Sequence, residues 1–327
     1  MQFEELFDRF KNIKVGVLGD LMLDTYMWGR VERISPEAPV PVVALNKKDY
    51  RIGGAGNVAL NLRALGASVS TLSVIGADDD GRVLRELLLD AGIDTSYLLD
   101  TASRITTNKT RIISRNQQMM RLDNEMTSDL AVEDAMLLEA HVLRYLDEVK
   151  PDILIFEDYN KGVLTEAIIA TVVRLCRERG ILTAVDPKRK NFFSYRNVDI
   201  FKPNLKEVRE GLNLIGEDAT LPWLQGVHEQ LHAQLKHRIS FITLSEKGVF
   251  YQSPDASGMI SSHVRNIADV SGAGDTVIAV ASLVYAATGD VALMAAVANI
   301  AGGLVCEEVG TAAIRRERLL EECKVLL

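Results

Sequence analysis

The sequence predicts a single α/β domain with a mainly parallel central sheet. Short apolar runs alternate with helical stretches along most of the 327-residue chain, an order typical of βαβ units. Two segments, within residues 26–50 and 106–122, break the alternation, because the first carries prolines and the second alternates apolar and polar residues. We expect antiparallel strands outside the main sheet there. No linker rich in Ser and Gly interrupts the chain, so we expect one domain over residues 1–327.

The expected strands of the main sheet are short and apolar, as is typical of strands buried on both faces. In chain order they lie at residues 14–19, 69–75, 153–156, 182–185, 200–201 and 241–244. Helical stretches separate them, at residues 58–65, 83–91, 130–149, 165–179, 277–285 and 291–305. The last two are apolar but are interrupted by a Gly-Asp pair, so we expect two core helices and no membrane span.

The most informative run is DVSGAGDT at residues 269–276. It stands at the entrance to an apolar helix, so the backbone N–H groups of Gly272, Ala273 and Gly274 should form an anion site at the positive end of that helix. A carboxylate at Asp275 would repel a phosphoryl group unless its task is to take a proton from an attacking hydroxyl. The alternative is a plain glycine turn in which Asp275 only favours the helix N-terminus.

A second glycine cluster, RIGGAGN at residues 51–57, opens another helical stretch. Between the two clusters lie KPNLKE at 202–207 and TLSEKG at 243–248. With these four runs in this order, the chain resembles the ribokinase-like (PfkB) sugar kinases over nearly its whole length. The resemblance implies an ATP-dependent kinase with a three-layer α/β fold, in which the strands outside the main sheet form a lid over the sugar. In the family the lid often makes a dimer contact, so we expect a homodimer.

The resemblance also implies the roles of the glycine clusters. Asp275 would be the general base, while Gly272, Ala273 and Gly274 would donate N–H groups to the phosphoryl group. The sugar would contact a second set of residues: Asp24, Gly53, Gly54 and Asn57. Asp24 follows the first strand, at the edge where open α/β sheets bind ligands, although it could be an ordinary loop acid. Asp20 is a weaker candidate for the same role.

On the nucleotide side, Asn204 and Glu207 stand at helix-turn spacing, so both side chains can point at one spot near the triphosphate. Mg²⁺ fits there, held through water. The strand and turn that follow supply Ser245 and Gly248, which the resemblance places against the nucleotide phosphates. A Ser-x-x-Gly turn is by itself more often only a turn.

Two further polar residues have two possible roles each. Asn299 lies in an apolar helix, where it is either a satisfied core amide or, as the family implies, a contact near the adenine. Asp269 either helps bind a monovalent cation, as in some relatives, or caps the helix that follows.

Two runs, at residues 33–42 and 114–123, are unusual for a generic sugar kinase and look like heptose 7-phosphate kinases. That resemblance implies phosphorylation of the anomeric hydroxyl of D-glycero-D-manno-heptose 7-phosphate to the 1,7-bisphosphate, in ADP-heptose and lipopolysaccharide precursor synthesis. A phosphorylated sugar needs fixed cations. Near the proposed site the chain offers Lys109, Arg111, Arg115, Arg121, Lys161 and Lys188. We expect Lys161 and Lys188, which follow strand ends, to bind the 7-phosphate.

Three other functions compete with this one. The chain could phosphorylate another sugar or sugar phosphate, such as ribose, fructose or fructose phosphate, since the motifs share one chemistry. It could be a non-catalytic nucleotide- or sugar-binding module, but binding alone would do better without Asp275. A dinucleotide-binding dehydrogenase is weaker still, because residues 54–59 satisfy only a loose form of its fingerprint and do not follow the first strand.

Composition excludes some partners. The 37 Lys and Arg residues against 45 Asp and Glu residues give a net charge of −8 without a dense basic run, so nucleic acid is not expected. Three cysteines without metal-type spacing indicate reduced thiols, and the acidic N-terminal residues do not fit a signal peptide, so we expect a cytoplasmic protein.

The five histidines do not form the His-x-Gly-His motif of the nucleotidyltransferase domain that follows the kinase in bifunctional relatives. We therefore expect that second activity on a separate protein. His228 and His232 share one helix face, where a metal pair is an alternative, but His237 is off that face. We expect an exposed helix there.

Overall fold

The computed structural model describes residues 2–327 except 116, 216, 217, 264 and 309, so one residue of the run 114–123 lies outside the described chain. Its elements, in chain order, are α1 (Phe3–Arg9), η1 (Phe10–Asn12), β1 (Lys14–Gly19), β2 (Leu21–Ile34), β3 (Pro41–Gly54), α2 (Ala55–Ala64), β4 (Ser68–Gly76), α3 (Asp79–Asp90), β5 (Asp94–Thr101), β6 (Asn108–Ser114), β7 (Gln117–Asn124), α4 (Val132–Glu148), β8 (Ile153–Glu157), α5 (Glu166–Glu178), β9 (Leu182–Asp186), η2 (Arg189–Asn191), β10 (Ile200–Phe201), α6 (Leu205–Leu212), α7 (Leu221–Leu235), β11 (Ile239–Thr243), η3 (Ser245–Lys247), β12 (Val249–Gln252), β13 (Ser257–Ile260), α8 (Ala273–Thr288), α9 (Val291–Val305) and α10 (Arg316–Leu326).

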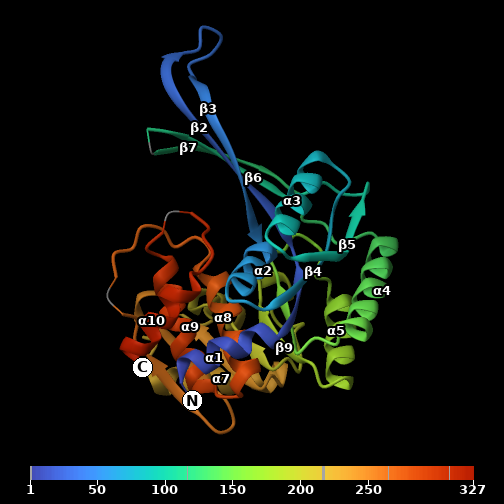
Figure 1. The fold of residues 1–327 in the computed structure, drawn as a ribbon, viewed down its shortest axis with the longest axis vertical. Helices are drawn as coiled ribbons and strands as arrows, with labels where there is room; N and C mark the ends of the chain where they lie inside the picture. Colours follow the sequence, from blue (N-terminus) through green and yellow to red (C-terminus); the bar gives the residue numbers. More distant parts are fainter. Residues whose placement is uncertain (1, 116, 216–217, 264, 309) are drawn as a thin grey trace.

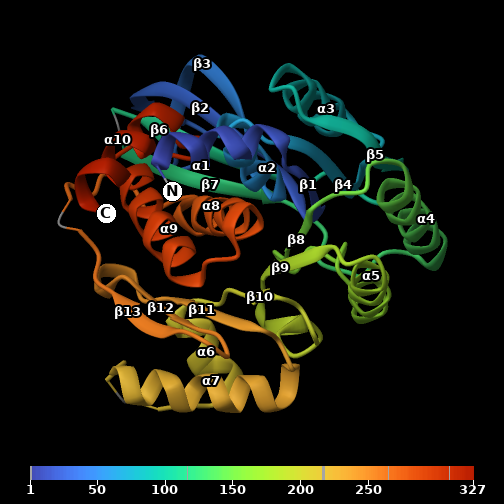
Figure 2. The same cartoon turned by 60° about the horizontal axis from the view of Figure 1, so that its bottom comes forward.

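The main sheet has nine strands in the order β13-β12-β11-β10-β9-β8-β1-β4-β5. Its pairs are parallel except those that join β12 to β11 and to β13. Helices cover both faces (Figure 2), and each face has its own apolar core. One core contains residues of α1, α2, α8, α9 and α10, and the other contains residues of α4, α5 and α7. The predicted three-layer α/β fold with a mainly parallel sheet is confirmed.

The two segments that broke the βαβ alternation form a separate four-stranded sheet in the order β3-β2-β6-β7, which we call the lid sheet. The β2–β3 hairpin projects far from the body of the molecule (Figure 1). Both hairpins are antiparallel as expected, but β2 and β6, which join them, are parallel. Each segment is thus an antiparallel hairpin as expected, whereas the parallel pairing between the two segments was not predicted. Only Asp20 separates β2 from β1 of the main sheet.

The expected exposed helix is α7, in which His232 is exposed and His228 half-buried, but His237 lies with these two histidines in one cluster. The ring of His237 lies 5.5 Å from that of His228 and 5.8 Å from that of His232, measured between centroids. His237 is fully buried, and its Nε2 lies 2.6 Å from the Ser240 hydroxyl, which is also 2.9 Å from Nδ1 of His228. The helix spacing missed this contact because His237 comes from the turn between α7 and β11.

Among the described residues, no helix combines the length and the apolar character that a membrane crossing needs. The long apolar helices α8 and α9 are instead packed against each other and against the main sheet.

Candidate active site

The N-terminus of α8 places Asp275 in the first turn of a helix that is buried from Asp275 to Tyr285. Gly272 caps this helix with φ +77°, a conformation that favours glycine. A Cβ atom on Gly272 would also come within 2.7 Å of the amide nitrogen of Asn57. The glycine is therefore needed for the turn and for the close approach of α2.

The carboxylate of Asp275 is anchored by two side chains from other parts of the chain. Nδ2 of Asn57 donates to its Oδ2 at 2.7 Å, and the hydroxyl of Tyr159 donates to its Oδ1 at 2.7 Å. Burial raises the pKa of Asp275, while these two hydrogen bonds stabilise the charged form and oppose the rise. The result is a buried, oriented carboxylate at the positive end of a helix, which suits a general base.

The sugar-side residues lie at the base of the lid sheet. Asp24 is inside strand β2, not in a loop after β1 as the sequence suggested, because β2 begins almost directly after β1. Its Oδ1 accepts a hydrogen bond from Arg111 on β6 at 2.6 Å. A Cβ on Gly53 would lie 2.5 Å from Oδ2 of Asp24, and one on Gly54, whose φ is +58°, would lie 2.5 Å from the carbonyl oxygen of Asp20. Both glycines thus allow β3 to pass close to these groups.

Asp20 is buried and holds a loop in place. Its carboxylate accepts hydrogen bonds from the backbone N–H groups of Tyr159, Lys161 and Val163. Burial, and then the nearby carboxylate of Asp158, raise the pKa of Asp20 to about 6. Asp20 therefore fixes the loop that carries Tyr159, whose hydroxyl donates to Asp275.

The two lysines expected at the 7-phosphate are held by different carboxylates. Lys161 pairs with Glu125, which follows β7 of the lid sheet, at 2.8 Å. Nζ of Lys188 lies 3.1 Å from Asp186 and 3.0 Å from Glu207. Burial would lower the pKa of Lys188, but these two carboxylates raise it. Lys188 thus contacts the motif expected for the nucleotide.

Asn204 and Glu207 cap helix α6 together. Oδ1 of Asn204 accepts from the backbone N–H of Glu207 at 2.9 Å, and Oε2 of Glu207 accepts from the backbone N–H of Asn204 at 2.8 Å. In this structure the two side chains therefore point at each other's backbone instead of at one external spot. Their part in holding Mg²⁺ stays a prediction.

The remaining nucleotide candidates lie in turns and at a helix surface. Ser245 is exposed and begins the short helix η3, which ends at Gly248 with φ +94°. A Cβ on Gly248 would lie 1.9 Å from the carbonyl oxygen of Ile260, so this tight turn needs glycine. Asn299 is half-buried and donates to the carbonyl of Ser261 at 2.9 Å, so it ties α9 to the segment after β13.

Asp269 closes the glycine turn that precedes α8. Its carboxylate accepts from the backbone N–H and the hydroxyl of Ser271, and from the backbone N–H of Gly310 at 2.9 Å. Burial opposes ionisation, but these hydrogen bonds lower the pKa of Asp269. These contacts make it a local cap, and a monovalent cation there stays a prediction.

Sequence reasoning missed four residues that surround Asp275: Tyr159, Glu157, Asp186 and Lys202. Carboxylate oxygens of Glu157, Asp186 and Asp275 lie within 4.8 Å of one another, and all three residues are buried. Nζ of Lys202, which is 2% exposed, lies 2.8 Å from Asp186. Asp186 ends strand β9, and Lys202 follows strand β10. Their position at the carboxyl edge of the sheet could have identified them as site candidates from the sequence.

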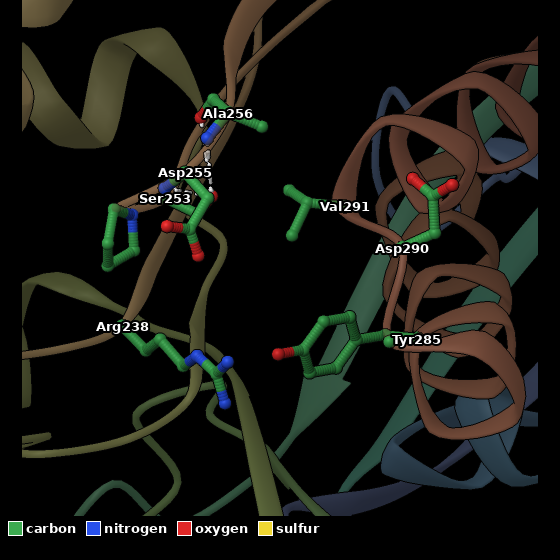
Figure 3. A pocket seen from close by; sticks show the side chains of 9 residues that line it. Arg238, Ser253, Asp255, Ala256, Tyr285, Asp290 and Val291 are labelled. Carbon is green, nitrogen blue, oxygen red and sulfur yellow. Dashed lines mark hydrogen bonds between the residues drawn. The ribbon is translucent and has the colours of Figure 1, made fainter.

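A cavity lies at the other end of α8 (Figure 3). It measures about 220 Å³ and is lined by Arg238, Tyr285, Asp290 and the turn between β12 and β13. It shares no residue with the carboxylate cluster, so it is separate from the site that contains Asp275.

Comparisons with known proteins found related sequences over nearly the whole chain. A family model described as pfkB family carbohydrate kinase matches residues 12–318. The chain is 39% identical over 326 residues to a protein of Citrifermentans bemidjiense named bifunctional protein HldE, covering 98% of this chain and 65% of that protein. A protein of the same name from Methylobacillus flagellatus is 39% identical over 94% of this chain and 62% of its own length. The chain thus spans less than two thirds of these curated relatives.

Solved structures show the same fold. Phosphofructokinase-2 from Escherichia coli, in complex with potassium, has a TM-score of 0.78 at 18% identity, covering 94% of this chain and 97% of that one. Arabidopsis thaliana ribokinase, complexed with ribose and ATP, has a TM-score of 0.72 at 16% identity, covering 94% of this chain and 98% of that one.

Proposed function

Because the chain belongs to the pfkB family of carbohydrate kinases, we propose that it transfers the γ-phosphoryl group of ATP to the anomeric hydroxyl of D-glycero-D-manno-heptose 7-phosphate. The products are the 1,7-bisphosphate and ADP. The observation that carries the proposal is the anchored carboxylate of Asp275 at the N-terminus of α8, held by Asn57 and Tyr159.

In this mechanism Asp275 accepts the proton of the sugar hydroxyl as the hydroxyl oxygen bonds to the γ-phosphorus. The bond from that phosphorus to the bridging oxygen breaks, and the electron pair leaves with ADP. The N–H groups of Gly272, Ala273 and Gly274 stabilise the charge on the phosphoryl oxygens. Removal of one such donor costs roughly 3–4 kcal/mol in other enzymes. Helix α8 therefore supplies both the base and the anion site.

Magnesium would be held through water by the oxygen donors of Glu207 and Asn204, a donor type that suits this ion. It would neutralise phosphate charge when bound. The nucleotide itself would meet Ser245, Gly248 and Asn299, and a monovalent cation would lie beside Asp269. These assignments rest on the family motifs.

The sugar would bind between the lid sheet and the main sheet, against Asp24, Gly53, Gly54 and Asn57. Lys161 is the proposed ligand of the 7-phosphate, because its ammonium group pairs with Glu125, which follows β7 of the lid sheet. Lys188 is instead assigned to the phosphoryl-transfer region, because its ammonium group pairs with Asp186 and Glu207. The heptose itself is supported by the runs at 33–42 and 114–123.

The wider setting is also a proposal. The enzyme would act in the cytoplasm as a homodimer, in ADP-heptose and lipopolysaccharide precursor synthesis. The curated relatives are named bifunctional, so in them two functions share one polypeptide. For this chain, a nucleotidyltransferase on a separate protein stays a prediction.

The test is phosphorus NMR of the products formed from ATP, Mg²⁺ and a panel of sugars that includes heptose 7-phosphate, heptose, fructose 6-phosphate and ribose. We expect the highest kcat/KM for heptose 7-phosphate, with a new anomeric phosphate signal. Asp275→Asn should lose about 10²–10⁴ in kcat, whereas Asp255→Asn, an exposed acid between β12 and β13, should not. A faster reaction with ribose or fructose 6-phosphate would reject the heptose; an Asp275→Asn variant with more than about a tenth of normal kcat would reject the base.

A further inference from the structure

Glu157 is a buried carboxyl without a partner in the middle of the site. It ends strand β8, is 0% exposed, and neither of its carboxylate oxygens has a hydrogen-bond partner among the described residues. Its side chain is nevertheless close to two other acids. A carboxylate oxygen of Glu157 lies within 4.8 Å of carboxylate oxygens of Asp186 and Asp275. Buried polar atoms are nearly always hydrogen-bonded, so this orphan requires an explanation.

The nearby cations are already paired with other acids. Lys202 lies 2.8 Å from Asp186, and Lys188 lies between Asp186 at 3.1 Å and Glu207 at 3.0 Å. Neither lysine makes an ion pair with Glu157 among the described contacts, although both lie near enough to influence it. An ionised Glu157 would thus be a buried charge with no partner, which is among the most costly arrangements in a protein.

We propose that Glu157 carries a proton in the resting enzyme and is a positioning residue for the base, because its neutral carboxyl leaves Asp275 as the acid that ionises beside the phosphoryl site. Ionisation of Glu157 would add a further, unpaired negative charge next to Asp275 and next to the γ-phosphoryl group. The site would then repel its substrate, so the proton on Glu157 acts as a switch. The activity consequence rests on the proposed phosphoryl transfer, whereas the proton itself does not.

The charged groups that face Glu157 support this assignment. Burial raises the pKa of Glu157 well above its ordinary range, and the carboxylates of Asp186 on β9 and Asp275 on α8 raise it further. Lys188 after β9 and Lys202 after β10 lower it, but do not offset the rise. Among three neighbouring carboxyls in low dielectric, the one without a hydrogen bond is the one expected to hold the proton.

The first experiment measures the proton directly by infrared spectroscopy of the intact protein over a pH series. We expect a band of a protonated carboxyl at pH 7 that is missing in Glu157→Gln and present in Glu178→Gln, a matched change at an exposed position of α5. The second experiment records kcat/KM against pH. The alkaline decline of the wild-type enzyme should coincide with the loss of the band, and Glu157→Gln, which cannot ionise, should remove that decline.

Three results would overturn the inference. One is the absence of a Glu157-dependent band at pH 7; another is an alkaline decline that persists in Glu157→Gln. The third is a Glu157→Gln variant with at least tenfold weaker Mg²⁺ binding in calorimetry, because that would show an ionised ligand in place of a neutral carboxyl. If the band is present but no sugar is phosphorylated, the proposed function fails and the protonation stands.

Discussion

Tyr159 is the residue next to the base whose hydrogen bond can be removed with the smallest change in shape. Its hydroxyl donates to Oδ1 of Asp275 and stabilises the ionised form. Since the base must be ionised, kcat/KM should fall as the pH falls through the raised pKa of Asp275. Tyr159→Phe should move this acidic limb to higher pH, by about one to two units if the bond contributes about 1.5–3 kcal/mol.

The control for Tyr159→Phe is Tyr195→Phe, because the hydroxyl of Tyr195 donates to a different buried acid, Asp158, at 2.7 Å. This variant should lose stability but keep the acidic limb of the wild-type enzyme. The acidic limb is measured as kcat/KM over a pH series for the wild type, Tyr159→Phe and Tyr195→Phe. If the limb lies at the same pH in all three proteins, the hydroxyl of Tyr159 does not stabilise the ionised base.

Adding a single carbon atom at Gly53 tests the proposed sugar-binding residues. Gly53→Ala would bring a Cβ to 2.5 Å from Oδ2 of Asp24. Either the side chain of Asp24 or strand β3 must therefore shift. We expect KM for the sugar to rise at least about tenfold, the effect of losing about 1.4 kcal/mol of binding, with a small effect on nucleotide affinity. Gly226→Ala is the matched control, because a Cβ in that helix meets nothing within 4 Å and alanine favours a helix. An unchanged KM in Gly53→Ala would remove Asp24 from the sugar site.

At the scale of elements, the lid sheet is the part expected to respond to substrate. Its strands carry large apolar side chains that are strongly exposed, including Ile34 at 61% and Met120 at 55%. We expect hydrogen exchange in β2, β3, β6 and β7 to slow when heptose 7-phosphate binds, because closure would exclude water from the phosphoryl transfer. Exchange that stays unchanged at saturating sugar would contradict a closing lid.

The same exposed side chains lead to a separate prediction about assembly. Exposed apolar strand surfaces favour pairing with a second chain. Light scattering should give a dimer for the wild-type protein, and Met120→Lys on β7 should shift it toward monomer. Lys206→Met, a change at an exposed position on α6, controls for altered charge. A wild-type monomer at working concentration would exclude dimerisation through the lid sheet.

The elements differ in how far the sequence could predict them. Six of the nine strands of the main sheet and the glycine turn before α8 are local patterns that periodicity and glycine spacing found, whereas β5, β12 and β13 were not predicted. The parallel pairing of β2 with β6 is set by contacts between distant segments, and no local pattern encodes it. The same reason explains the missed site residues: Glu157 ends an apolar strand, and its importance depends on Asp186 and Asp275, which other segments bring beside it.

At the scale of the whole molecule, the histidine cluster predicts sensitivity to acid. Burial and the neighbouring rings lower the pKa of His228 to about 4 and that of His237 to about 3, compared with about 6.5 in an unfolded chain. The unfolded state therefore binds more protons below about pH 6.5, so the free energy of unfolding should fall as the pH is lowered toward 4.

Each such histidine contributes a slope of up to about 1.4 kcal/mol per pH unit. His237→Asn should reduce the slope by about one proton between pH 6 and 4.5, measured by denaturant unfolding at each pH. His263→Asn, at a histidine that has no part in the described ring contacts of this cluster, should leave the slope unchanged. Equal slopes for the wild-type protein and His237→Asn would show that the cluster is not responsible.

The division of the site between two sheets has a consequence for how such an enzyme can change over evolution. Asp24 and Arg111 belong to the lid sheet, whereas Asp275, Asp186 and Lys202 belong to the main sheet and the helix above it. Under the proposed function, mutations in the lid sheet would therefore change the contacts to the sugar while leaving the groups around the phosphoryl transfer unchanged. Grafting the β2–β3 and β6–β7 hairpins from a relative onto this body would accordingly test whether the lid sheet sets substrate choice.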